Sequence, residues 1–152
     1  LNLPRQNLLI YYIFKNLLIC KTNYFILQSR IYYKDKKIAE NKLADLSMEF
    51  SINTLKMLDN VKGHYALKNQ LEKSSTSIGA NIREAKYAQS KADFISKLQI
   101  ALKECYETEY WLELFQKANI TNDKNLPKLS HDCGTIRRML IASVNTAKSN
   151  SK

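Results

Sequence analysis

The sequence has little glycine or proline, with three glycine and two proline residues in a chain of 152. A β-sheet domain needs many tight turns, and turns depend on these two residue types. Single domains cluster near about 100–150 residues, so the length suits one domain with a real core. The shortage argues against an all-β fold and favours helices.

Cysteine is also scarce. Cys20, Cys105 and Cys133 are odd in number, widely spaced and in no CxxC pair. This pattern does not predict a disulfide framework, which fits a reducing cytoplasm. We therefore expect a cytoplasmic protein in which Cys105, on an apolar helical seam, acts as a small hydrophobe.

Only two histidines occur, His64 and His131. Bundles that hold two iron atoms use Glu-x-x-His pairs, but Val61 and Lys128 stand three residues before these histidines. His131-Asp132-Cys133 is too short a cluster to make a zinc site alone. With no nucleophile–base pair or phosphate loop either, we expect a non-enzymatic protein without metal, cofactor or small-molecule substrate.

A long hydrophobic run is missing as well. Residues 1–37 contain apolar stretches, Leu8–Phe14 and Asn23–Leu27, but polar residues interrupt them. A membrane span needs about 20 predominantly apolar residues, and no small-residue cleavage site follows as in a signal peptide. Because the chain begins with Leu1, we interpret residues 1–37 as a poorly ordered extension read upstream of the natural start. The alternative is an amphipathic helix that packs on the bundle or lies on a membrane surface.

The net charge of +10 is unevenly placed. Residues 1–37 hold seven Lys or Arg and one Asp, whereas residues 38–152 hold 17 basic and 13 acidic side chains. The second part is therefore only mildly basic. A solubilising surface explains such an excess, and nucleic-acid binding is compatible with it.

Apolar residues at helical spacing predict four helices within residues 38–149. Their expected bounds are about Asn41–Lys62, Tyr65–Gln89, Ser90–Ala118, and a last helix with Pro127 in its first turn that runs to about Ala147. Short links make sequential helices antiparallel neighbours. The expected fold is an all-α, up-down-up-down antiparallel four-helix bundle with an N-terminal extension.

The expected core follows one stripe on each helix. On the first helix this stripe includes Leu43, Phe50 and Met57, widened by Leu55. Gly79 lies inside the second helix, where glycine costs about 1 kcal/mol relative to alanine. Close packing of a neighbouring helix is the simplest reason for it.

A capping box marks the start of the third helix. In Ser90-Lys91-Ala92-Asp93 the serine oxygen accepts from the amide of Asp93, and the carboxylate returns to the amide of Ser90. Aspartate is shorter than the usual glutamate, which makes the return bond the weaker expectation.

Three polar residues share one face of the second helix: Ser77, Asn81 and Glu84, spaced four and three apart. We interpret them as a structural hydrogen-bond network that fixes helix packing. The alternative is a stripe that contacts a ligand or nucleic acid.

Basic residues on two helices form the candidate nucleic-acid surface. They are Lys73, Arg83 and Lys86, beside Tyr87, and Arg137 and Arg138 on the last helix. The third helix is acidic in its second half, at Glu104, Glu107, Glu109 and Glu113. This acidic face is either solvated or paired with the two arginines within or between subunits.

Trp111 and Leu114 lie off the core stripe of the third helix. They belong either to a wider core or, with Tyr110, to a subunit interface.

The segment Ser74–Phe115 closely resembles the 23S rRNA intervening-sequence proteins. The resemblance rests on TSIGANI (Thr76–Ile82) with Glu84, then ADF, IALKE, ET and YWL within residues 92–112. It covers Asn41–Ala118 well and the last helix only by pattern, and residues 1–37 not at all. Ala85 departs from it, because many members have glycine there.

The resemblance implies a small bacterial four-helix-bundle protein that forms homo-oligomers, in particular ring-like pentamers, with no established enzymatic activity. Such proteins are similar to the accessory bundle protein of diversity-generating retroelements, which binds a reverse transcriptase and nucleic acid. Our leading hypothesis is therefore a homo-oligomeric bundle that contacts RNA or a nucleoprotein partner, with no membrane role. The alternative is a protein–protein adaptor or scaffold.

Overall fold

The computed structural model describes residues 26–27, 30 and 42–149. The chain divides into two compact units, Leu1–Glu40 and Asn41–Lys152, and the helices described below lie in the second. The predicted extension, residues 1–37, lies almost wholly outside the described residues, so both interpretations of it stay predictions.

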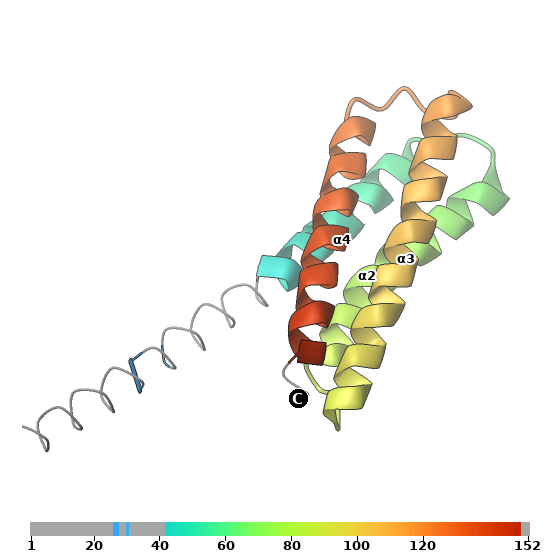
Figure 1. Cartoon of the computed structure of the whole chain (residues 1–152). Coiled ribbons are helices and arrows are strands. Elements are labelled where there is room, and N and C mark those ends of the chain that lie inside the picture. The colour runs from blue at the N-terminus through green and yellow to red at the C-terminus, as the bar shows by residue number, and fades with distance from the viewer. Residues whose placement is uncertain (1–25, 28–29, 31–41, 150–152) are drawn as a thin grey trace, which may run out of the picture. The chain divides into compact units, whose positions relative to one another are not determined.

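The second unit is a bundle of four helices (Figure 1). They span residues 42–59, α2 (Tyr65–Ala85), α3 (Lys91–Lys117) and α4 (Leu126–Ser149). The residues that the structure describes include no strand. The chain reverses direction at each connection, and α3 contacts both α2 and α4. The predicted all-α four-helix bundle is confirmed.

The connection between helix 42–59 and α2 turns through two left-handed residues. Gly63 has φ +71°, a left-handed conformation that glycine adopts without strain. His64, the residue that precedes α2, also has positive φ, at 51°. The Lys68 ammonium donates to the Val61 carbonyl oxygen at 2.8 Å, so it satisfies an acceptor just beyond the end of helix 42–59.

Helix α2 ends at Ala85, four residues before the predicted Gln89. The next three amides bond three residues back: Lys86 to Arg83, Tyr87 to Glu84 and Ala88 to Ala85. This tightening uses the last carbonyl groups of the helix without continuing it. Helix 42–59 also stops before the predicted Lys62, with similar tightening at Asn60 and Val61.

The predicted cap at Ser90 is confirmed, because its hydroxyl accepts from the Asp93 amide at 3.1 Å. The return bond differs from the prediction. The Asp93 carboxylate accepts from the amide of Gln89, at 3.1 Å, instead of that of Ser90. The connection from α2 to α3 is thus held on both sides of the cap.

Helix α3 ends in a Schellman motif, which the sequence analysis did not predict. The Ile120 amide donates to the Phe115 carbonyl and the Asn119 amide to that of Gln116. Asn119 is left-handed, with φ 51°. Ile120 packs against the core that contains Phe115, which supplies the hydrophobic contact typical of this motif.

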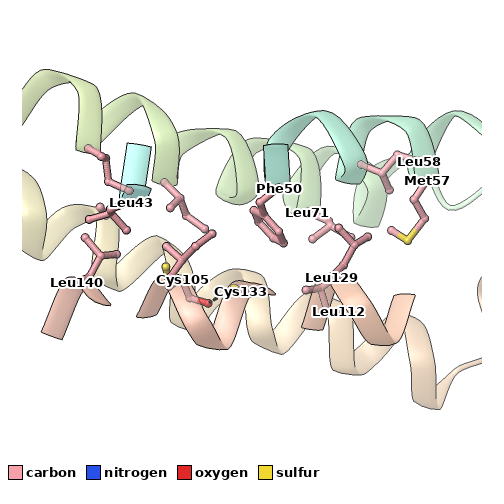
Figure 2. Packing of buried hydrophobic residues seen from close by; sticks show 14 of the residues in the cluster. Leu43, Phe50, Met57, Leu58, Leu71, Cys105, Leu112, Leu129, Cys133 and Leu140 are labelled. Atoms are coloured by element: carbon pink, nitrogen blue, oxygen red, sulfur yellow. Dashed lines mark hydrogen bonds between the residues drawn. The ribbon is translucent and has the colours of Figure 1, made fainter. Parts of the chain in front are cut away.

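The core follows the predicted stripes of all four helices (Figure 2). Phe50, Leu71, Phe115 and Leu129 lie buried between the helices. One prediction was wrong. Leu55 keeps 37% of its surface exposed because it lies on the outer side of helix 42–59.

Small polar residues form the seam between helix 42–59 and α2. The buried hydroxyl groups of the bundle belong to Ser47, Ser51, Thr54, Ser74, Ser75 and Thr108. All six donate to a carbonyl of their own helix, and the Ser51 hydroxyl also lies 3.3 Å from the Ser75 carbonyl. Thr108 crosses from α3 to the Ser74 hydroxyl at 3.0 Å.

Gly79 lies on this seam, but the packing there does not require glycine. A Cβ atom at Gly79 would meet the Ser47 hydroxyl at 3.5 Å and the Ser51 hydroxyl at 3.7 Å. These are ordinary van der Waals distances. The helices approach closely here, but the position has room for one methyl group.

Candidate functional site

The predicted polar stripe on α2 divides into two separate contacts. The Asn81 amide donates to the backbone carbonyl of Ser77 at 2.9 Å. Glu84 instead forms an ion pair with Lys97 of α3, which raises the pKa of Lys97 through a hydrogen bond and the carboxylate charge. The stripe is therefore not one connected network, because Glu84 points to the neighbouring helix. The buried polar residues are instead the serine and threonine residues of the seam between helix 42–59 and α2.

Two of the predicted basic residues lie beside acidic residues of α3. Arg137 donates from Nε to Glu109 at 2.8 Å, and this bond raises the pKa of Arg137 above its ordinary value. Arg138 lies nearby, since a Cβ atom at Gly134 would meet Arg138 Nη1 at 3.5 Å and Glu109 Oε1 at 3.6 Å. Of the two interpretations of the acidic face, pairing with Arg137 within the subunit is observed.

Lys73 of α2 also faces this acidic helix, near Glu104. Burial raises the pKa of Glu104, the charge of Glu107 adds to the rise, and Lys103 and Lys73 oppose it. A phosphate group that approached Lys73 would thus meet a carboxylate close by.

The other predicted basic residues gather at the connection between α2 and α3. Arg83 is in the last turn of α2 and Lys86 is its C-cap residue. Tyr87 follows with 82% of its surface exposed, and Lys91 is the first residue of α3. All four side chains are exposed. The structure therefore separates Arg83 and Lys86 from the more acidic surroundings of the other three cations.

A second surface lies on the outer side of α3. Tyr106 and Tyr110, one turn apart, are 53% and 58% exposed. Trp111 packs against the core, donates to Glu107 at 3.3 Å and contacts the Tyr110 ring edge-on, with centroids 4.9 Å apart. Trp111 thus belongs in part to a wider core, and Tyr110 is the more accessible member of the predicted interface. Leu114 is half-buried.

Helix 42–59 also has an exposed apolar stripe, which was not predicted from the sequence. Met48, Ile52 and Leu55 are 46%, 43% and 37% exposed. Their spacing of four and three places them on one face. This spacing was the available signal, but a second apolar stripe looks like a widening of the core when only the sequence is known.

The described residues offer little chemistry for a reaction. Within residues 26–27, 30 and 42–149, no group of three His, Cys, Asp or Glu side chains could hold a metal ion. In the short run that was judged too small for a zinc site, His131 is exposed, Asp132 binds Lys128, and Cys133 is buried. The hydrogen bond with Cys133, together with burial, raises the pKa of Cys105 far above its ordinary value, which disfavours a reactive thiolate.

No helix among the described residues combines the length and apolar character that a bilayer span requires.

Comparison with known proteins gives two positive findings. Residues 39–142 match the family model of the 23S rRNA-intervening sequence protein. The chain is also similar to the crystal structure of a protein with unknown function from the S23 ribosomal protein family of Bacteroides thetaiotaomicron. The two share 39% sequence identity with a TM-score of 0.65, over 70% of this chain and 98% of that chain. No curated protein matches.

The matched region contains all four helices apart from the last turns of α4, which agrees with the resemblance first drawn from the motifs around Gly79 and Trp111. The chain belongs to the family of 23S rRNA-intervening sequence proteins.

Proposed function

We propose that this protein is a non-enzymatic bundle that contacts RNA, alone or within a nucleoprotein, through the basic end formed by the connection between α2 and α3. The observation that carries the proposal is the group of exposed cations at this end, Arg83, Lys86 and Lys91. Among the described residues, none of the three is in an ion pair. Phosphate groups attract such side chains and release counterions on binding.

The acidic residues close to this end are already engaged. Glu84 pairs with Lys97, and the Asp93 carboxylate accepts from the Gln89 amide. Their negative charge is thus partly compensated within the protein. The cations on the other side of α2 and on α4 differ, because Glu104 and Glu109 lie beside them.

The test is a measurement of RNA affinity against salt concentration. We expect the logarithm of the binding constant to fall with the logarithm of salt, by about 0.7 for each phosphate contact to a single strand. A variant with Arg83→Gln and Lys86→Gln should bind more weakly with a shallower slope. Lys124→Gln, an exposed cation in the connection between α3 and α4, is the matched control. Binding that is absent at low salt, or that does not respond to salt, rejects the proposal.

A second candidate function, a self-associating adaptor, is favoured by the exposed aromatic residues of α3. Tyr106 and Tyr110 expose more than half of their surfaces on one helix face. Tyrosine and tryptophan are enriched at protein interfaces because they combine a large apolar area with a polar group. We propose that Tyr110, Trp111 and Leu114 lie in the contact between copies of this chain. The same assembly is compatible with RNA contact at the basic end.

Light scattering tests this assembly. We expect the parent protein to have a mass that is a multiple of the subunit mass, with five subunits as the number that the family resemblance implies. Tyr110→Asp should reduce the mass, because an ionised side chain at an interface is costly to desolvate. Tyr65→Asp is the matched control, since Tyr65 is 76% exposed in the first turn of α2. An unchanged mass in Tyr110→Asp counts against the interface.

A further inference from the structure

Tyr87 has the largest exposed fraction, 82%, among the exposed large hydrophobic side chains of the described residues. It stands in a connection only five residues long, between Ala85 and Lys91. Three cations lie within four positions of it in sequence: Arg83, Lys86 and Lys91.

The connection that carries Tyr87 is held by backbone and cap bonds. The Tyr87 amide donates to the Glu84 carbonyl at 2.9 Å, and the Ala88 amide donates to Ala85 at 3.2 Å. On the other side, Ser90 caps α3 and Asp93 binds the Gln89 amide. The backbone therefore presents the ring from a fixed turn, and less ordering is needed when a flat ligand stacks on it.

Helix stability explains only some of the positively charged residues at this connection. Cations at the C-terminal end of a helix interact favourably with its dipole, which accounts for Arg83 and Lys86. Lys91 is at the opposite kind of end, the first residue of α3. A positive charge there interacts unfavourably with the helix dipole, so α3 gains nothing from it. A negatively charged ligand at this connection would give Lys91 a role.

An exposed aromatic ring flanked by cations has the chemistry that binds single-stranded nucleic acid. Bases stack on the ring while cations follow the phosphate backbone, and stacking needs no particular base. A duplex offers its phosphates but hides the faces of its bases. An acidic peptide offers carboxylates but no flat ring that would require Tyr87. The exposed ring therefore indicates a single-stranded nucleic acid as the ligand, in preference to a duplex or an acidic peptide.

We infer that Tyr87 is a stacking platform for an unpaired base of RNA, and that Arg83, Lys86 and Lys91 hold the adjoining phosphates. This inference rests on the proposed RNA contact and narrows it to single-stranded RNA at one connection. The sequence-based prediction placed Tyr87 beside the basic residues but gave it no contact with a base. It did not include Lys91.

The experiment measures the affinity of the full chain for a fluorescein-labelled 12-nucleotide oligouridylate by fluorescence anisotropy. Tyr87→Ala should weaken binding roughly 5- to 150-fold, the range measured when a stacked aromatic residue is removed. Its salt slope should stay that of the parent, because no charge is lost. Tyr87→Phe should restore parental affinity, since the ring is kept. Lys91→Gln should lower the slope by about 0.7.

Tyr65→Ala, at an exposed tyrosine of the first turn of α2, is the matched control and should bind as the parent does. Circular dichroism of each variant checks that the helices are intact. A hairpin duplex of equal length and polyglutamate serve as competitors, and both should displace the oligouridylate poorly.

The outcomes separate this inference from the proposed function. If the parent binds but Tyr87→Ala binds equally well, the platform is overturned while RNA contact stands. Equal competition by the duplex or by polyglutamate likewise overturns the preference for a single strand. If the parent binds no RNA at low salt, the proposed function itself fails, and this inference fails with it.

Discussion

His64 has the left-handed backbone conformation that glycine adopts without strain, with φ 51° and ψ 35°. For other residues this conformation costs about 1–2 kcal/mol, whereas glycine loses about 0.5–1 kcal/mol more backbone entropy on folding. We expect His64→Gly to raise the free energy of unfolding by about 0.5–1 kcal/mol, as measured by urea denaturation. His64→Ala is the control, since alanine keeps the left-handed strain. Equal stability of the two variants would contradict this explanation.

Glu104 gives the fold a pH dependence at the same scale. Burial and the charge of Glu107 raise its pKa, so the folded chain favours the protonated carboxyl. The resulting penalty is absent below the pKa of the unfolded chain and complete above the pKa of the folded one. We therefore expect Glu104→Gln to be more stable than the parent at pH 7, with the gain shrinking as the pH falls through this window.

Urea denaturation at pH 7 and at about pH 4 measures that difference. Glu72→Gln, at an exposed position of α2, is the control for the loss of one negative charge. A gain in Glu104→Gln that is the same at both pH values would show that burial of the charge is not its cause.

At the scale of the helices, Gly79 lies where helix 42–59 and α2 approach each other closely. A methyl group there would meet Ser47 and Ser51 at ordinary contact distances. Gly79→Ala should therefore keep the packing and gain helix propensity, by up to about 1 kcal/mol. Gly79→Leu should cost about 1–3 kcal/mol, because the larger side chain overpacks the seam.

Thermal and urea unfolding of both variants test this packing. A destabilised Gly79→Ala would mean that the helices approach more closely than these distances indicate. A tolerated Gly79→Leu would mean that the seam can open without cost.

A buried hydrogen bond between Thr108 of α3 and Ser74 of α2 joins these two helices. The Thr108 hydroxyl lies 3.0 Å from the Ser74 hydroxyl and also bonds to the Glu104 carbonyl of its own helix at 2.7 Å, and Thr108 and Ser74 are fully buried. Removing one partner of a buried pair typically costs about 1–3 kcal/mol. We expect Thr108→Val and Ser74→Ala each to be destabilising, with the double variant less so than the sum. A double-mutant cycle of unfolding free energies measures the coupling, and strict additivity would contradict a direct interaction.

At the scale of the whole molecule, helical periodicity was enough to predict the bundle and most of its core. Leu71, Leu112 and Leu140 are buried as their spacing requires. Helix ends were less predictable, since α2 continues for three residues as a tightened turn that its apolar pattern does not reveal. The cap at Ser90 was predictable because it depends on local residues only.

The candidate surfaces were only partly predictable. Charge pairing between the acidic half of α3 and Arg137 followed from opposite signs on adjacent helices. The separation of Lys73 from Arg83 and Lys86 did not, because it depends on which cations face α3. Exposure of Leu55 and Tyr110 also depends on how wide a stripe the neighbouring helices cover, and this is a tertiary property.

The division of the chain leads to a prediction for a shortened protein. The bundle lies in the unit Asn41–Lys152, and the similar Bacteroides thetaiotaomicron chain aligns over 98% of its length with 70% of this one. A protein that starts at Asn41 should therefore unfold in one cooperative transition with the same midpoint as the full chain. Urea denaturation followed by circular dichroism checks this. A large loss of stability would show that residues 1–40 are part of the folded unit.

The buried serine and threonine residues have a wider consequence. Each of the six hydroxyl groups has a carbonyl acceptor three or four residues earlier in its own helix, so none of them depends on the opposite helix for an acceptor. What this interior face specifies is volume more than bonding partners. A face of that kind can accept many exchanges among small residues, while its tolerance for bulk remains narrow.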